Sequence, residues 1–412
     1  MKSNLLEIDH SFRIIRTHST SLLIVLAFVS LFFVTPSLAE DSHHARHRPK
    51  ETAAREKTET YYTNRNGIVT STAPRPQPGM KLTKTVYGFH PYWYGTAYNS
   101  YDFSLLSTVS YFSYHVDPGT GDQKGVFFWE DTPLIDMAKA AGSRIDLTIT
   151  SFGNADNRLF LGNRTAQKHC IETVTKLLKK KNADGICIDF ESIPSTMRNE
   201  FTNFVTAFSR HLGKEIPDAT VSLALYAIDW QHVFDIPGLL PVVDQFILMA
   251  YDYHYSSSTD AGPIAPLQNG KIWPPFSVEQ SVETYIEKGL PASKIILSVP
   301  YYGQKWQTKG KIFPSKNLGH LETIPYRKIV PLLQQDPKEW DASSFSEFLI
   351  GSQDDQISQL WYDGARSLKA KYQYAKAKGL AGVAIFALGY DNGHDELWQI
   401  IQDEFLDRAP PQ

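Results

Sequence analysis

The chain is poor in cysteine, carries no excess of charge of one sign, and has few long apolar runs. Among its 412 residues only Cys170 and Cys187 carry thiols, and the formal net charge is −3. Two cysteines exclude a small scaffold held by several disulfides. A near-neutral charge gives no reason to expect nucleic acid as a partner. With 42% hydrophobic and 21% charged residues, the composition is that of a globular protein with a substantial core.

One long apolar run lies near the N-terminus, at residues 22–34 (LLIVLAFVSLFFV). Basic residues precede it, and Ser37-Leu38-Ala39 follows as a small-x-small cleavage sequence. A membrane-spanning helix needs about 20 apolar residues, so we interpret residues 1–39 as a signal peptide cut after Ala39. We therefore expect a secreted or periplasmic protein with no other membrane contact. The alternative is an uncleaved anchor at residues 21–39, with the protein facing outside the cytoplasm.

Residues 40–82 form a block of different composition, rich in charge, His and Pro and nearly free of large apolar residues. This composition is typical of a disordered linker. Metal binding by His43, His44 and His47 is the alternative.

From residue 83 to about residue 408, short apolar runs alternate with longer amphipathic stretches. The runs are residues 85–92, 108–116, 144–152, 185–191, 220–226, 245–253, 294–301 and 382–388. Helix-like stretches separate most of them, for example 132–141, 165–180, 198–211, 278–288 and 365–378. Such alternation predicts parallel strands with helical crossovers. Eight units of this kind favour an α/β fold of the (β/α)8 TIM-barrel class over two doubly wound domains.

The connection between the seventh and eighth runs is too long for one crossover. A helix-like stretch near residues 326–333 and strand-like stretches at 344–350 and 356–362 lie within it. They predict a small α+β insertion at approximately residues 304–362. Residues 83–408 would then form one domain.

The run at residues 185–191 (GICIDFE) is apolar on both faces until its C-terminal end, as in a strand buried within a parallel sheet. Alternation places Cys187, Asp189 and Glu191 on one face. Buried carboxylates are costly unless they are paired or take part in chemistry, although a solvated strand end would also explain them. Cys170 lies in the helix expected outside this strand, so the sheet would separate the two sulfurs and we predict free thiols.

Aromatic and acidic residues recur together where the runs end: GFHPYW at 88–93, MAYDY at 249–253, PYYGQKW at 300–306 and FALGYDNG at 386–393. In a barrel of this class, active sites lie at the C-terminal ends of the strands. Aromatic rings stack on the C–H faces of sugars and carboxylates transfer protons, so the pattern suits a carbohydrate site. Taken singly, Met249 and Tyr251 would be read as core packing, and His90 and Trp93 as closing the barrel rim.

Several of these sequences resemble motifs of glycoside hydrolase family 18, the family of chitinases and some spore or cell-wall N-acetylglucosaminidases. The stretch DGICIDFE at 184–191 is similar to the family's Asp-Gly-x-Asp-x-Asp-x-Glu strand, and MAYD at 249–252 to its Met-x-Tyr-Asp. Ser151-Phe152-Gly153 resembles its Ser-x-Gly-Gly, and residues 382–388 its eighth strand. The resemblance covers about residues 83–406, and residues 361–393 are similar to bacterial members.

The resemblance implies a retaining glycosidase acting on β-1,4-linked N-acetylglucosamine glycans, either chitin oligomers or peptidoglycan. Glu191 would be the general acid, while Asp189, Tyr251 and Asp252 would hold the substrate's 2-acetamido group, which serves as nucleophile in this family. Predicted substrate-binding residues are Phe89, Trp93, Ser151, Met249 and Phe386. We expect no cofactor or metal, since the sequence has no Gly-rich phosphate loop or other cofactor motif. We also expect the protein to be a monomer. The alternative is a non-catalytic, lectin-like protein on the same fold.

Three positions depart from the family pattern. Cys187 stands where the middle acid is usual, Phe386 where the eighth strand usually has Trp, and Asn154 where the second Gly of the third-strand motif is usual. A mostly neutral thiol repels Asp189 less than a carboxylate would, so Asp189 should ionise more readily. A phenyl ring stacks over a smaller area than an indole and lacks its N–H.

Overall fold

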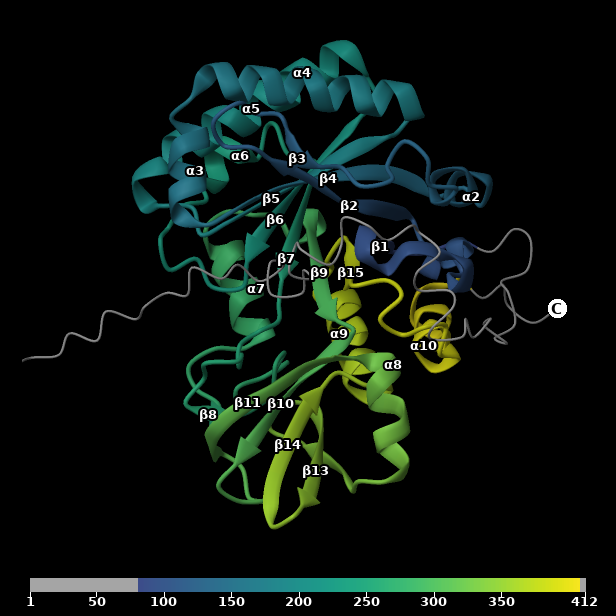
Figure 1. Ribbon diagram of the computed structural model, residues 1–412, viewed down its shortest axis with the longest axis vertical. Helices are drawn as coiled ribbons and strands as arrows, with labels where there is room; N and C mark the ends of the chain where they lie inside the picture. Colours follow the sequence, from purple (N-terminus) through teal and green to yellow (C-terminus); the bar gives the residue numbers. More distant parts are fainter. Residues whose placement is uncertain (1–80, 408–412) are drawn as a thin grey trace, which may run out of the picture. The chain divides into compact units, whose positions relative to one another are not determined.

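The computed structural model describes residues 81–407 (Figure 1), so the predictions for residues 1–39 and for nearly all of 40–82 lie outside the described residues. Eight parallel strands form a closed barrel in the order β1-β15-β9-β7-β6-β5-β4-β2, with β1 pairing back onto β2. They are β1 (Thr85–Pro91), β2 (Thr108–Val116), β4 (Arg144–Phe152), β5 (Gly185–Glu191), β6 (Thr220–Tyr226), β7 (Gln245–Met249), β9 (Ile295–Pro300) and β15 (Gly382–Phe386). The predicted (β/α)8 barrel is confirmed.

The barrel strands coincide closely with the apolar runs because their side chains are buried on both faces. Every residue of β2 and β5 is buried. Two expected ends were wrong: β7 stops at Met249 instead of 253, and β15 at Phe386 instead of 388. Asp252 has a positive φ of 57°, which is incompatible with continuing an extended strand. The turn that ends β7 therefore comes before the acidic residue.

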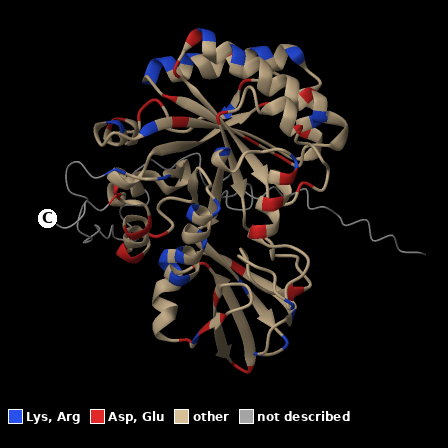
Figure 2. Cartoon of the chain, turned by 180° about the vertical axis from the view of Figure 1, so that it is seen from behind, with Lys and Arg blue, Asp and Glu red and all other residues tan. Residues whose placement is uncertain are grey.

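Helices surround the barrel and bury one apolar stripe each against it. They are α2 (Leu134–Ala140), α3 (Asn154–Leu161), α4 (Arg164–Lys181), α5 (Arg198–Glu215), α6 (Ile236–Leu239), α7 (Val278–Glu287), α9 (Ala365–Ala377) and α10 (Asp395–Phe405). On α5, for example, the ring of Phe204 stacks 5.4 Å from that of Phe190, on the outward face of β5. Figure 2 shows Lys, Arg, Asp and Glu along the outer helices, whereas the barrel strands are mainly uncharged. Among residues 81–407, none of the helices has the length and apolar character needed to cross a bilayer.

An antiparallel second sheet follows β9, which confirms the insertion between the seventh and eighth barrel strands (Figure 1). Its strands are β8 (Asp260–Ala261), β10 (Tyr302–Thr308), β11 (Ser315–Pro325), β12 (Lys338–Asp341), β13 (Ser346–Gln353) and β14 (Gln356–Tyr362). The expected helix is divided into α8 (Tyr326–Ile329) and a 3-10 helix at Val330–Gln334. The short strand β8 comes from the loop after β7, so that loop joins the sheet too. A further short strand, β3 (Gln123–Gly125), pairs antiparallel with the C-terminal end of β2.

A buried ion pair joins the second sheet to the barrel helix α9. Lys371 Nζ lies 2.9 Å from Asp363 Oδ1, and both side chains are almost fully buried. The Ser367 N–H at the start of α9 donates to the Glu347 carboxylate of β13 at 3.3 Å. Removing one partner of a buried pair typically costs about 3–5 kcal/mol, because the other charge remains in a low-dielectric interior. These contacts hold the insertion in one position against α9.

Candidate active site

Strand β5 carries three polar side chains into the barrel. Cys187, Asp189 and Glu191 are all buried, and in the parallel ladder they stand beside Thr148, Thr150 and Phe152 of β4. The intervening Phe190 points outward and packs on the helices. The shared face predicted from the spacing of Cys187, Asp189 and Glu191 is therefore the face of β5 that points into the barrel, toward the C-terminal end of the strand.

The backbone at Glu191 is fixed by neighbouring loops. Its carbonyl oxygen accepts hydrogen bonds from Asn157 Nδ2 at 2.6 Å and from the Gly153 N–H at 3.1 Å. Gly153 has a φ of 97°, a conformation that favours glycine, which explains a glycine directly after β4. These contacts fix where the Glu191 side chain begins.

Tyr226, the last residue of β6, braces the same segment from the other side. Its hydroxyl donates to the Phe190 carbonyl at 2.9 Å and accepts from the Ile193 N–H at 3.2 Å. Neither Tyr226 nor Asn157 was singled out from the sequence, since an aromatic or amide residue near a strand end has no distinguishing spacing. Both are positioning residues for the end of β5, where Glu191 lies.

Tyr251 lies with the two carboxylates of β5. Its pKa is raised well above the usual value, first by burial and then by the charges of Asp189 and Glu191. The nearby Ser298 side chain on β9 opposes this rise. Tyr251 is therefore a neutral phenol, and a neutral phenol can donate a hydrogen bond to a bound group.

Asp252 follows directly and is held by the insertion. Tyr302, the first residue of β10, donates a hydrogen bond from its hydroxyl to Asp252 Oδ1 at 2.8 Å, and both side chains are buried. The sequence pointed to residues 300–306 as an unusual strand end but did not give Tyr302 a role. The second sheet thus supplies a contact to the candidate site.

Aromatic rings gather beside these polar groups. The Phe386 ring lies 6.2 Å from that of Tyr251 at an interplanar angle of 28°, 5.9 Å from Phe89 and 5.8 Å from Phe112. Trp93, on the 3-10 helix at Tyr92–Ser100, meets Phe112 edge-on at 5.7 Å. Met249 is fully buried at the end of β7. The structure brings these residues together, and their contact with sugar remains a prediction.

Ser151 and Asn154 lie apart from this group. Ser151 is in register with outward-pointing Phe190, so the ladder places it on the face of β4 toward the helices. Asn154 is the exposed first residue of α3. The register therefore favours packing over substrate contact for Ser151.

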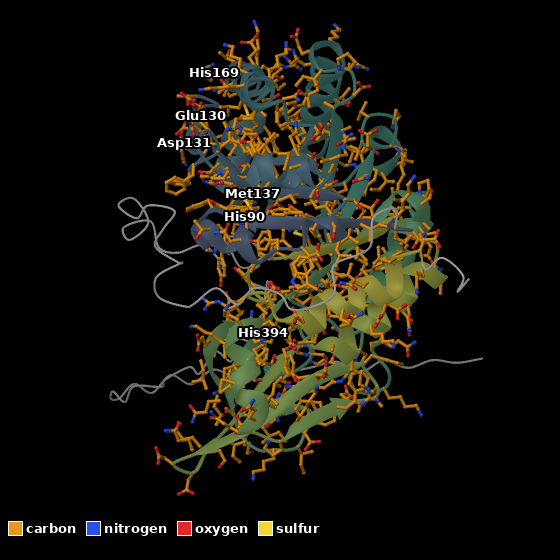
Figure 3. All side chains as sticks on the ribbon, turned by 90° about the vertical axis from the view of Figure 1, so that its right-hand side faces the viewer. His90, Glu130, Asp131, Met137, His169 and His394 are labelled. Carbon is orange, nitrogen blue, oxygen red and sulfur yellow. The ribbon has the colours of Figure 1, made fainter. Side chains whose placement is uncertain are left out.

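His90, labelled in Figure 3, is buried in a ring of tyrosines. Its Nδ1 lies 2.8 Å from the Tyr101 hydroxyl, and its ring contacts Tyr98 and Tyr111. Burial lowers the pKa of His90 to about 3, so the imidazole is neutral. This setting supports the rim-closing interpretation of His90.

A polar layer lies deeper in the barrel, beneath Asp189. Burial, followed by the charges of Asp189 and Asp146, raises the pKa of Cys187 well above its usual value, so the thiol is neutral. Tyr87 donates to Asp146 Oδ2 at 2.9 Å, and burial raises the pKa of Asp146 to about 7. Cys170 is buried on α4, and neither cysteine is bonded, which confirms the predicted free thiols.

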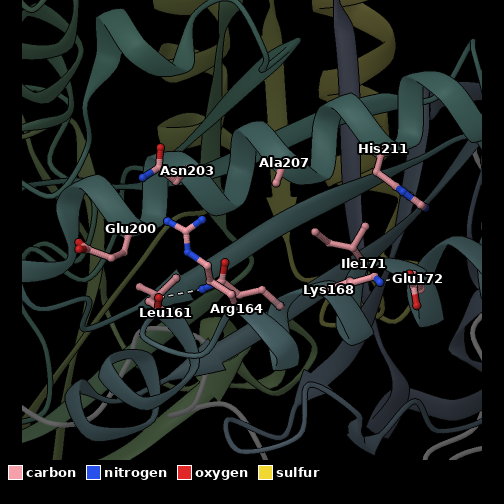
Figure 4. A pocket seen from close by; sticks show the side chains of 10 residues that line it. Leu161, Arg164, Lys168, Ile171, Glu172, Glu200, Asn203, Ala207 and His211 are labelled. Atoms are coloured by element: carbon pink, nitrogen blue, oxygen red, sulfur yellow. Dashed lines mark hydrogen bonds and ion pairs between the residues drawn. The ribbon is translucent and has the colours of Figure 1, made fainter.

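A separate groove of about 360 Å³ lies between α4 and α5 (Figure 4). Its lining includes Arg164, Lys168, Glu200 and His211, and it shares no residue with the candidate site. Within the described part of the chain, no group of three or more His, Cys, Asp or Glu side chains is arranged to hold a metal ion.

A closed (β/α)8 barrel with paired carboxylates and aromatic rings at its strand ends is an architecture suited to glycosidases. The family model described as "Glycosyl hydrolases family 18" matches residues 57–391, and the chain belongs to this family. The match begins within the segment interpreted as a linker.

Individual relatives agree with this assignment. The chain is 26% identical over 249 residues to the "Uncharacterized glycosylase YvbX" of Bacillus subtilis, covering 59% of this chain and 67% of that protein. It is 22% identical over 289 residues to the "Cortical fragment-lytic enzyme" of the same organism, covering 66% of this chain and 63% of that one. The chain thus spans about two thirds of these relatives or less.

Among solved structures, the chain is similar to a GH18 chitinase from Cycas revoluta in complex with (GlcNAc)3. The TM-score is 0.70 at 19% identity, covering 78% of this chain and 99% of that one. This likeness supports the fold.

Proposed function

We propose that the protein hydrolyses β-1,4-linked N-acetylglucosamine glycans, chitin oligomers or peptidoglycan strands, with retention of the anomeric configuration. The observation that carries the proposal is the placement of Asp189 and Glu191 at the end of β5, beside Tyr251 and Asp252, in a chain of glycosyl hydrolase family 18. Relatives named as glycosylase and lytic enzyme, and a chitinase bound to GlcNAc units, support this substrate class.

In this mechanism Glu191 donates its proton to the glycosidic oxygen as the bond to the anomeric carbon breaks. The oxygen of the 2-acetamido group attacks that carbon, so no second carboxylate is needed as nucleophile. Asp189 accepts a hydrogen bond from the acetamido N–H and stabilises the positive oxazolinium. Water then opens this ring with Glu191 acting as base, which restores the original configuration.

The groups around Asp189 and Glu191 are consistent with these roles. Tyr251, a neutral phenol, would donate to the acetamido oxygen, and the Tyr302 hydrogen bond holds the adjacent Asp252. The neutral Cys187 adds no charge beneath Asp189, whereas a carboxylate at that position would oppose a second negative charge nearby. Phe386, with Phe89 and Tyr251 around it, would form the floor beneath the sugar ring.

We further propose that the chain acts outside the cytoplasm as a monomer, either released after cleavage at Ala39 or anchored through residues 21–39. This location matches that of chitin and peptidoglycan.

The direct test is incubation with N-acetylchitooligosaccharides and, separately, with purified peptidoglycan, followed by product analysis by mass and by NMR of the new reducing end. We expect shortened products whose new end first appears as the β anomer. Binding of oligosaccharides without any product would instead support the lectin-like alternative.

A further inference from the structure

Trp230 is an exposed aromatic residue at the active-site end of the barrel. All eight tryptophans of the chain lie within residues 81–407, and Trp230 is 56% exposed, whereas six others are buried. The remaining one, Trp340, is partly buried and covered by the guanidinium of Arg366 at 3.8 Å. Together with the neighbouring Phe276 ring, 5.0 Å away, this exposed indole forms a small aromatic surface after β6.

The loop that carries Trp230 is held in place on both sides of the indole. The buried carboxylate of Asp229 accepts hydrogen bonds from the Val233 N–H at 2.9 Å and the Phe234 N–H at 3.3 Å. Lys288 Nζ of the α7 C-cap lies 3.5 Å from the same carboxylate. These contacts fix the backbone of the loop that carries Trp230, which lowers the cost of ordering this loop on binding.

Phe276 supports the indole laterally. The two ring centroids lie 5.0 Å apart with an interplanar angle of 88°. A perpendicular contact covers at most one face of the indole, and 56% of the Trp230 surface is exposed and available to a flat apolar partner. The C–H face of a pyranose ring is such a partner.

Trp230 lies in the loop that follows β6, the strand next to the one that carries Glu191. It follows Tyr226 by four residues, and the Tyr226 hydroxyl binds the backbone at Phe190 and Ile193, on either side of Glu191. Four residues span at most about 14 Å. Strand β6 is also the direct neighbour of β5 in the barrel. A glycan bound at Glu191 can therefore reach the indole.

We propose that Trp230, braced by Phe276, is a binding subsite for one sugar ring of an N-acetylglucosamine glycan that extends beyond the cleaved bond. The proposal rests on the proposed function. It adds that chain length matters: an oligomer long enough to cover both Glu191 and Trp230 gains a stacking contact that a shorter one does not.

The test measures binding of N-acetylchitooligosaccharides of two to six units by calorimetry, in a Glu191→Gln background that prevents turnover. Trp230→Ala should weaken binding of the longest oligomers by about five- to tenfold and leave the shortest unchanged. Trp230→Phe should recover part of the loss, because a smaller ring still stacks. Leu159→Ala, which removes another exposed apolar side chain from α3, serves as the matched control and should bind like its parent.

Equal affinity of the Trp230→Ala protein and its parent for every oligomer would overturn the subsite and leave the proposed function intact. A loss that is the same for all lengths would also overturn it, since a subsite must discriminate by length. The proposed function fails in a different case, in which the Glu191→Gln protein binds no oligomer and the unmodified protein cleaves no oligomer and no peptidoglycan. The subsite proposal then fails with it.

Discussion

Replacing Tyr302 by Phe isolates the contribution that the insertion makes to the candidate site. The substitution keeps the ring and removes the hydroxyl that donates to Asp252 Oδ1 at 2.8 Å. A hydrogen bond to a charged group contributes about 1.5–3 kcal/mol. If Asp252 must be oriented in the transition state, kcat/KM should fall by about 10- to 100-fold.

The neighbouring Tyr301 offers a matched control. Its hydroxyl lies 3.4 Å from that of Tyr372 on α9, so Tyr301→Phe removes a long contact between two neutral groups near the same strand end. We expect kcat/KM to change by less than about threefold in this variant. Steady-state kinetics on an N-acetylchitooligosaccharide, with urea unfolding of each protein, separates lost activity from lost stability. Equal losses in both variants, or none in Tyr302→Phe, would refute the role given to Tyr302.

Three further predictions concern the buried layer and the N-terminus. Burial raises the pKa of Asp146 to about 7, so the folded protein holds a proton that the unfolded chain releases, and the free energy of unfolding falls as pH rises from about 4 to 7. Asp146→Asn should remove roughly 4 kcal/mol of this fall, measured by urea unfolding at several pH values. An unchanged pH dependence would contradict the assignment. Cys187→Asp places an acid beneath Asp189 and should shift the pH–rate profile, whereas a profile like that of the parent would make Cys187 a core filler. Mature protein should begin near Glu40, and both thiols should react once it is unfolded without reductant; an intact N-terminus would favour the anchor, and no reactive thiol would mean a disulfide.

The barrel was predictable because its strands are buried on both faces and appear as apolar runs. Strands β10 and β11 were missed, since residues such as Gln304 and Lys305 interrupt their apolar pattern. Strands β10 and β11 are stabilised by antiparallel hydrogen bonding with each other, and β10 also pairs with β14, which is distant in the sequence. The helices α3 and α10 were not singled out either: α3 has only 8 residues, and α10 lies after the last barrel strand instead of between two strands.

For the candidate site, alternation along β5 was enough to place Asp189 and Glu191 on one face. It could not reveal Asn157, Tyr226 or Tyr302, whose importance lies in hydrogen bonds across 34 to 50 residues of sequence. Ser151 illustrates the opposite error: a motif residue can fall on the outward face once the ladder register is known.

The central claim is that Glu191 is the proton donor. Glu191→Gln preserves the shape of the side chain and removes its transferable proton, so the measurement is turnover of an N-acetylchitooligosaccharide beside the affinity for the same oligomer. Turnover should fall by at least about 100-fold while binding persists. Turnover equal to that of the unmodified protein would contradict the account, because Glu191 would then have no part in the chemistry.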